Sequence, residues 1–491
     1  MATIKDLAGQ TAIYGFSTIL GRLLNYLLVP LQTYVFNEPS QYGVVGELYA
    51  WVSLFIVLLT YGMETAFFRF SQEEQYKQKT LSTVAGSLFV TSLIFIITAV
   101  CFSQQIADFL EFSNHPEYIT WFAIIIGVDA FTSIFFASLR QQLRPLRFAI
   151  VKITNISVNI LLNLFFLLLC PYLLQENIAP ELVRMVYNPE IGVGYIFISN
   201  LIASIITLLM LMPELLKVKF SFSWTLWKKM MAYGFPLLIL SLAGIVNETM
   251  DRVLLRWLSP PDIAQAQVGI YSACYKISIM MTLFVQAYKY AAEPYFFNKS
   301  KDSDAKQTYA DTMSIFVLIC SFIFLGIMFY MDIVQYFVGS NYREGLPIVP
   351  ILLLSNLFLG IFYNLSIWYK LTDQTYFGAY ISIFGAIITL GLNYLLIPIL
   401  GYMGSAWATF ACYFAMMVIS YFLGRKHYHV PYKVFRIFFY IALAVGIYFL
   451  STLIPELSSV LKMSIHTTLL LLYIAIIYIV DRKYIREIFQ R

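Results

Sequence analysis

Long blocks of apolar residues recur along the whole chain, and short polar stretches separate them. A helix needs roughly 20 mainly apolar residues to cross the hydrocarbon core of a bilayer, and most blocks reach that length. Windows of about nineteen residues predict about fourteen membrane-spanning helices. The predicted spans lie near residues 11–34, 43–63, 83–102, 119–139, 149–170, 191–212, 231–256, 266–290, 310–330, 346–369, 376–397, 404–423, 434–453 and 461–480.

The composition supports this interpretation. Of the 491 residues, 60% are hydrophobic and only 12% are charged, and the mean hydropathy is +0.75. Soluble domains carry about 25% charged residues, so the surplus of apolar side chains must face lipid. The pattern and the composition together predict an all-α integral membrane protein.

Basic residues indicate the orientation of the chain. Twenty-five of the 32 lysines and arginines lie in, or at the border of, one alternate set of predicted loops and the chain ends, Lys152 and Lys289 among them. The other set of loops contains only Arg184 and Arg343. The positive-inside rule then predicts a multi-pass protein of the inner (plasma) membrane with both termini in the cytoplasm. The net charge of +5 reflects this asymmetry, so we expect no nucleic-acid partner.

The loops and cysteines argue against an enzyme. The predicted loops are too short for a soluble catalytic or nucleotide-binding domain, and no GxxxxGK[ST] motif occurs that would hold phosphates. The five cysteines are scattered and form no CxxC motif, which excludes a disulfide framework or a thiolate metal site. We therefore expect no catalytic residues, no cofactor and no metal.

Two echoes within the sequence suggest an internal repeat. Gln41-Tyr42-Gly43, with Tyr49 six residues after the glycine, recurs 226 positions later as Gln267-Val268-Gly269 with Tyr275. Arg140, Ala149 and Asn163 correspond to Lys370, Ala379 and Asn393 at an offset of 230. Each offset covers six spans, an even number, which is typical of parallel repeats. We expect an N-terminal six-helix lobe (1–213), a pseudo-symmetric C-terminal six-helix lobe (214–424) and two additional helices (425–491).

Three motifs carry a resemblance to a known family. They are Arg22-Leu23-Leu24-Asn25-Tyr26 followed by Pro39-Ser40-Gln41-Tyr42-Gly43, then Asp251-Arg252-Val253-Leu254-Leu255 followed by Val268-Gly269-Ile270-Tyr271-Ser272 and Tyr275-Lys276, and finally Ile397-Pro398-Ile399-Leu400-Gly401-Tyr402-Met403-Gly404-Ser405-Ala406. In order and spacing the chain resembles the polysaccharide flippases (O-antigen or capsule type) of the multidrug/oligosaccharidyl-lipid/polysaccharide (MOP) exporter superfamily. The resemblance implies the fold of that superfamily's exporters. It also implies that the chain turns undecaprenyl-pyrophosphate-linked oligosaccharides from the cytoplasmic to the outer leaflet by alternating access.

Ionisable residues within spans are costly and are functional candidates by default. Arg22, Lys276, Arg252 and Arg256 are our candidates for binding the anionic headgroup, since arginine offers two-pronged hydrogen bonding to phosphate. Structural pairing with buried carboxylates is the alternative, and Arg256 could simply extend to the interface.

Other polar residues in the spans have two possible roles. Asp129, Glu47, Glu64, Glu248 and Asp251 either bind a coupling proton or sodium ion or pair with the cations. A stripe of Asn155, Asn159 and Asn163 either bonds a neighbouring helix or lines a wet cavity that suits sugar hydroxyls.

We expect a monomer whose partners are the lipid-linked oligosaccharide and membrane lipids. Two other functions within the superfamily remain open from the sequence. They are cation-coupled antiport of drugs or metabolites and flipping of a peptidoglycan precursor.

Overall fold

A computed structural model describes residues 20–219, 221–454 and 458–489. Within these ranges, thirteen helices are long and apolar enough to cross a membrane, and each overlaps one of the spans predicted from 43–63 onward along most of its length. The first predicted span, near 11–34, lies partly outside the described residues, and its described part is helical over 20–26 and in α2 (Leu28–Val35). The prediction of an all-helical membrane fold is confirmed.

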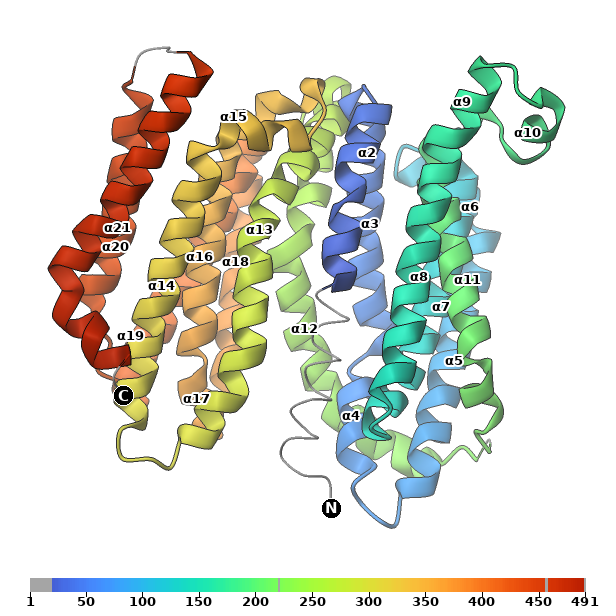
Figure 1. Cartoon of the computed structure of the whole chain (residues 1–491). Helices are drawn as coiled ribbons and strands as arrows, with labels where there is room; N and C mark the ends of the chain where they lie inside the picture. Colours follow the sequence, from blue (N-terminus) through green and yellow to red (C-terminus); the bar gives the residue numbers. More distant parts are fainter. Residues whose placement is uncertain (1–19, 220, 455–457, 490–491) are drawn as a thin grey trace. The chain divides into compact units, whose positions relative to one another are not determined.

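The helices follow one another with short connections (Figure 1). In the first half they are α3 (Pro39–Thr60), α4 (Met63–Phe70), α5 (Lys77–Cys101), α6 (Ser103–Phe109), α7 (Pro116–Gln141), α8 (Pro145–Leu164), α9 (Cys170–Gln175), α10 (Pro180–Val186), α11 (Gly194–Leu216) and α12 (Trp224–Leu258). In the second half they are α13 (Pro261–Lys299), α14 (Ala305–Phe329), α15 (Met331–Val334), α16 (Val349–Leu365), α17 (Ile367–Leu371), α18 (Tyr376–Leu400), α19 (Tyr402–His427), α20 (Val434–Thr452) and α21 (Ser459–Phe489).

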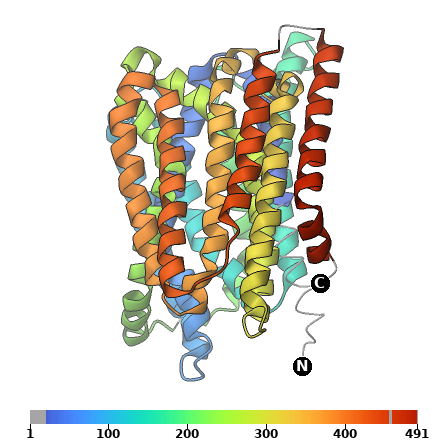
Figure 2. The same cartoon turned by 90° about the vertical axis from the view of Figure 1, so that its left-hand side faces the viewer.

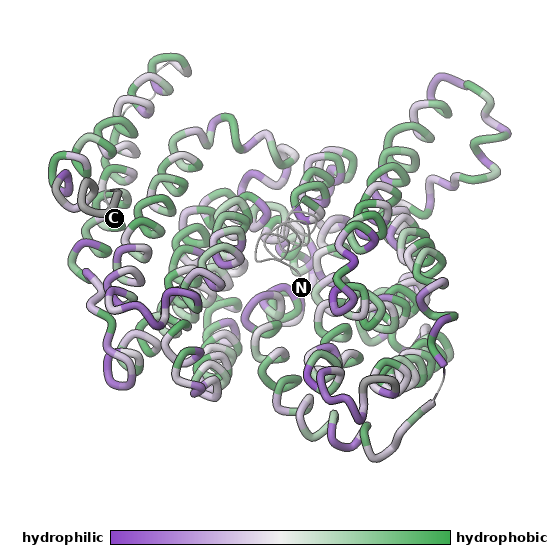
Figure 3. Tube along the Cα trace, turned by 60° about the horizontal axis from the view of Figure 1, so that its bottom comes forward, coloured by the Kyte–Doolittle hydropathy of each residue, from purple (hydrophilic) through white to green (hydrophobic). Residues whose placement is uncertain are grey.

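Local sequence sets where several helices begin and end. Proline stands at the start of α3, α7, α8 and α13, where its missing N–H costs nothing and its fixed φ suits the first helical turn. Between α3 and α4, Tyr61 (φ 30°) and Gly62 (φ 73°) adopt left-handed backbone conformations that interrupt the helix. Figure 3 shows hydrophobic residues along the helices and hydrophilic residues concentrated in the connections.

The chain forms two compact units. Unit 1 comprises residues 1–257 and 261–269, and unit 2 comprises residues 258–260 and 270–491. The first nine residues of α13 therefore pack with unit 1, whereas the rest of the helix belongs to unit 2. This division is based on packing and does not test the repeat boundary predicted near residue 213. That boundary stays a prediction.

In unit 1, two glycines bring the starts of α3 and α13 into backbone contact. A Cβ on Gly43 would lie 2.0 Å from the carbonyl oxygen of Gln265, and one on Gly269 would lie 1.8 Å from that of Pro39. Each glycine thus contacts the residue four positions before the other, so the contact is reciprocal. The two members of the QYG/QVG echo meet at this crossing.

In unit 2, α20 and α21 run side by side (Figures 1 and 2) and are joined to α14 by polar contacts. The Lys433 ammonium lies 2.9 Å from the Asp311 carboxylate on α14. Between the last two helices, the Arg436 guanidinium lies 2.7 Å from Asp481, which also accepts a hydrogen bond from the Tyr440 hydroxyl. Lys433, Arg436 and Asp481 are therefore paired within the fold.

Candidate functional site

A cluster of charged side chains lies among the helices of unit 1. Lys152 on α8 is half-buried and lies within electrostatic range of Asp129, Arg140, Glu64 and Arg22. The Arg140 guanidinium forms an ion pair with the Glu64 carboxylate on α4. Lys152 thus lies within electrostatic range of two other cations and two carboxylates.

Lys152 itself is held by an aromatic ring. Its ammonium lies 4.5 Å from the centre of the Phe136 ring on α7, a distance at which a cation is attracted to the face of an aromatic ring. The Phe136 ring therefore helps to hold the half-buried Lys152 ammonium in place.

Amide and hydroxyl groups continue the polar interior of unit 1. Asn200 on α11 donates a 2.9 Å hydrogen bond to the Tyr49 hydroxyl on α3, and Tyr49 also lies within electrostatic range of Asp129. Asn155 on α8 donates a 2.9 Å hydrogen bond to the Thr207 hydroxyl. These groups offer both donors and acceptors beside the charged cluster.

Two asparagines of the stripe on α8 form hydrogen bonds to other helices. Asn163 is fully buried and accepts a 3.2 Å hydrogen bond from the Gln32 amide on α2. It donates to the Asn159 backbone carbonyl at 2.9 Å and to its side chain at 3.0 Å. For Asn163 and Asn155 the bonds favour the helix-joining alternative, and a sugar-facing role stays a prediction.

A second charged cluster in unit 1 surrounds Arg256 near the end of α12. Its guanidinium forms an ion pair with Glu111, and its Nε lies 3.7 Å from an oxygen of Glu47. Glu47 is fully buried on α3, and Gln265 lies beside it. The sequence alternatives for Glu47 included pairing with Arg22 or Lys276, whereas in the structure Glu47 faces Arg256.

The neighbouring charges on α12 satisfy one another. Arg252 donates a 2.9 Å hydrogen bond to the Asp251 carboxylate and a 3.1 Å bond to the backbone carbonyl of Glu248. Arg252 and Asp251 are both buried. This local pairing supports the structural alternative for the α12 group, while its role in binding remains a prediction.

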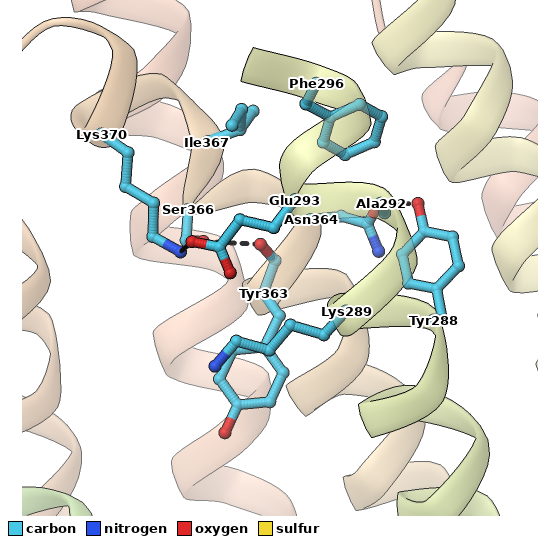
Figure 4. Close-up of a pocket in the computed structure, with 10 residues that line it drawn as sticks. All are labelled: Tyr288, Lys289, Ala292, Glu293, Phe296, Tyr363, Asn364, Ser366, Ile367 and Lys370. Atoms are coloured by element: carbon cyan, nitrogen blue, oxygen red, sulfur yellow. Dashed lines mark hydrogen bonds and ion pairs between the residues drawn. The ribbon is translucent and has the colours of Figure 1, made fainter. Parts of the chain in front are cut away.

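Unit 2 contains a pocket of its own, with basic side chains (Figure 4). The Lys370 ammonium on α17 lies 2.7 Å from the Glu293 carboxylate on α13. Lys289, one helical turn before Glu293, lies 4.5 Å from the centre of the Tyr363 ring. The pocket therefore combines two lysines with one carboxylate, as Figure 4 shows. Lys276, the predicted headgroup ligand in this part of the chain, is half-buried and lies nearer the start of α13 than Lys289 does.

The charged groups of the two units correspond to one another. Arg140 and Lys370 are the echo found in the sequence, 230 positions apart. Arg140 pairs with Glu64 and Lys370 pairs with Glu293, and the two glutamates are 229 positions apart. A half-buried lysine near each pair lies against an aromatic ring. Lys152 and Lys289 are 137 positions apart, so these two lysines do not stand at the repeat offset.

Sequence reasoning missed Lys152 and Lys289 as site residues because it assigned them to loop borders. The structure places them inside helices, since α8 already begins at Pro145 and α13 continues to Lys299. The i, i+4 spacing of Lys289 and Glu293 was a signal that helix continued past the hydropathy window.

Comparison with known proteins decides the family. The sequence profile of a family described as polysaccharide biosynthesis protein matches residues 7–300, which is more than half of the chain. The chain belongs to this family. Its family therefore links the chain to polysaccharide biosynthesis. The resemblance inferred from the sequence motifs is confirmed.

Solved structures show the same fold. The lipid II flippase MurJ in an inward closed conformation has a TM-score of 0.74 and 15% identity, covering 96% of this chain and 99% of its own. An inward-facing multidrug resistance MATE transporter has a TM-score of 0.65 and 14% identity, covering 83% and 94%. A MOP-superfamily transporter from Pyrococcus furiosus has a TM-score of 0.57 and 13% identity, covering 85% and 95%. A search of curated proteins yields no significant match.

Proposed function

We propose that this polysaccharide biosynthesis family member flips an undecaprenyl-pyrophosphate-linked oligosaccharide from the cytoplasmic to the outer leaflet by alternating access. Both termini would then lie in the cytoplasm. The observation that carries the proposal is the group of cations inside unit 1, where Lys152 lies within electrostatic range of Arg22 and Arg140. A polyanionic headgroup is a cargo that such a group of cations would bind.

The chemistry of the cluster suits a pyrophosphate. Burying a cation in a membrane costs about 2.5–3.5 kcal/mol on insertion scales, so a group of cations among the spans is a candidate for function. Phosphate oxygens accept short, charge-assisted hydrogen bonds from guanidinium and ammonium groups. The amides and hydroxyls of Asn200, Tyr49 and Asn155 could in turn bond sugar hydroxyls attached to the pyrophosphate.

We further propose that an ion gradient drives the cycle. Asp129 lies next to Lys152 within the spans, and a carboxylate that trades a lysine partner for a proton or sodium ion would couple the two movements. One charge moved through the membrane potential supplies about 2.3 kcal/mol per 100 mV. Flipping in energised vesicles should therefore exceed flipping after proton and sodium gradients are collapsed. Equal rates in both conditions would make the protein a passive facilitator.

Mass spectrometry of lipid-linked glycans from a deletion strain tests the proposed cargo. The strain should accumulate a complete polyprenyl-pyrophosphate oligosaccharide, and the wild-type gene should restore its consumption. Accumulation of a peptidoglycan precursor would favour the second candidate, which the similarity to a lipid II flippase supports. Unchanged lipid-linked glycans together with sensitivity to cationic drugs would favour an antiporter, as in the multidrug transporters of this fold.

A further inference from the structure

An apolar cavity of about 180 Å³ lies within unit 1. Its lining comes from α3, α5, α6 and α7, and all thirteen lining residues are apolar, including Trp51, Phe55, Phe95 and Phe109. An engineered apolar cavity of about 150 Å³ stays dry and accepts a hydrocarbon molecule. A space of this size and lining suits a hydrocarbon chain and neither a sugar nor a phosphate.

The short helix α6 closes one side of the cavity. Ile106 and Phe109 on this helix line the cavity. Its polar residues bond away from it, because the Gln104 amide donates to Asp108 at 2.9 Å and to the Ser113 carbonyl at 3.1 Å. The helix is thus amphipathic, and its apolar side belongs to the cavity.

The cavity adjoins the ion pairs of Arg256 through shared residues. Trp257 follows Arg256 in the chain. Its ring centre lies 5.8 Å from that of Trp51 and 6.0 Å from that of Phe109, and both of these residues line the cavity. On α3, Glu47 faces Arg256 and the next residue, Leu48, lines the cavity. A cationic group and a hydrocarbon-sized space therefore lie side by side.

One partner of Arg256 is suited to being exchanged. The Glu111 side chain is 64% exposed, whereas Glu47 is fully buried and the Arg256 side chain is 11% exposed. Glu111 also has a left-handed backbone conformation, with φ 60°, which is unfavourable for a residue other than glycine. A phosphate could replace the Glu111 carboxylate on Arg256 while the pair with Glu47 remains.

From these contacts we infer that unit 1 holds the polyprenyl-phosphate end of the cargo lipid. The phosphate binds Arg256 in place of Glu111, and the adjoining isoprene units enter the cavity. The inference rests on the proposed function and adds a specific site for the lipid part of the cargo. A bilayer phospholipid fits less well, because its two glycerol esters separate phosphate from hydrocarbon and would be buried against a lining whose only polar side-chain group is the Trp51 indole N–H. In a polyprenyl pyrophosphate the hydrocarbon begins directly at the phosphate oxygen.

Photolabelling tests the site. The probe is polyprenyl pyrophosphate with a diazirine on the isoprene unit next to the pyrophosphate, added to the full chain in phospholipid nanodiscs. Adducts should concentrate in peptides that contain residues 48–55, 95–110 and 119–126. Ala99→Phe and Ala123→Phe place a ring in the cavity and should each reduce this labelling about tenfold, as expected for a loss of about 1.4 kcal/mol of binding. The matched control is Ile94→Phe on the same helix α5, a position that is 59% exposed and should label as the wild type does.

The affinity of two charge variants provides an independent test with opposite signs. Arg256→Gln should raise the Kd of the probe, because a charge-assisted phosphate contact is lost. Glu111→Gln should lower the Kd, because the competing carboxylate is removed. A purely structural role of the Arg256–Glu111 pair predicts no gain from Glu111→Gln, and that result would overturn the inference.

Two further outcomes separate this inference from the proposed function. If the probe binds but its adducts lie elsewhere, or if phosphatidylglycerol with the same diazirine labels these peptides equally well, the site is wrong and the flippase proposal stands. If the probe does not bind the protein at all, both fail. Variants are compared only as monodisperse protein, and Glu111→Gln decides the question even if the phenylalanine variants do not fold.

Discussion

The glycine crossing between α3 and α13 allows a quantitative prediction. Gly43→Ala would place a methyl group 2.0 Å from the Gln265 carbonyl oxygen, and Gly269→Ala would place one 1.8 Å from that of Pro39. Carbon and carbonyl oxygen ordinarily approach to about 3.3 Å. The obstructing atoms belong to the backbone, so each variant requires the two helices to separate locally by about 1.3–1.5 Å.

The expected cost follows from two opposing terms. Overpacking of a close-packed interior costs about 1–3 kcal/mol, and a forced backbone shift belongs near the upper limit. Replacing glycine with alanine inside a helix otherwise gains about 1 kcal/mol. We therefore expect each variant to lose about 2 kcal/mol of stability. Once one methyl has separated the helices, the second meets less resistance, so the double variant should lose less than the sum.

Thermal unfolding of the purified protein, followed by tryptophan fluorescence, measures these differences. Gly244→Ala on α12 is the matched control, because no atom lies within 4 Å of its added Cβ, and it should be as stable as the wild type or more so. Glycan export in cells provides a second measurement. It should fall for Gly43→Ala and for Gly269→Ala but not for Gly244→Ala. If these two variants unfold at the temperature of Gly244→Ala, the close backbone crossing is wrong.

Three other predictions follow from the charged groups. Arg22→Ala should abolish glycan export at normal protein level, and Arg22→Lys should restore only part of it because the guanidinium geometry is lost; full rescue by adding Asp129→Ala would instead show a structural pair. Lys370→Ala should destabilise unit 2 by about 1 kcal/mol, as for a partly exposed ion pair. The loss of stability should be smaller when Glu293 is also replaced by alanine, and unfolding of the double variant measures this difference. A reporter fused after Arg147 should read cytoplasmic, and a periplasmic signal would refute the orientation.

The membrane fold could be predicted from the sequence because it follows from hydropathy alone. Every span predicted from 43–63 onward overlaps an observed helix along most of its length, since a lipid-facing helix needs a long apolar segment wherever it packs. Helix ends were less predictable. The α13 helix extends to Lys299, nine residues past its predicted span, because the polar end of a helix looks like a loop to a hydropathy window.

The candidate site could be predicted only in part, since pairing depends on three-dimensional packing. Arg256 and Glu47 were both recognised as candidates, but their pairing with each other and with Glu111 joins residues far apart in sequence. Lys152 was recognised only as a topology signal, although it lies beside Asp129. The apolar cavity left no signal at all, because apolar residues that line a cavity and those that face lipid look alike in a sequence.

The central claim is that this chain moves a lipid-linked oligosaccharide across the bilayer. The most direct measurement uses the purified protein in liposomes that contain a fluorescent polyprenyl-pyrophosphate oligosaccharide in both leaflets, with a membrane-impermeant reductant added outside. With the wild-type protein and an imposed ion gradient, the bleached fraction should rise from about half toward completion, and Arg22→Ala should remain at the value of protein-free liposomes. Bleaching by the wild type that stops at half, like that of protein-free liposomes, would contradict the account.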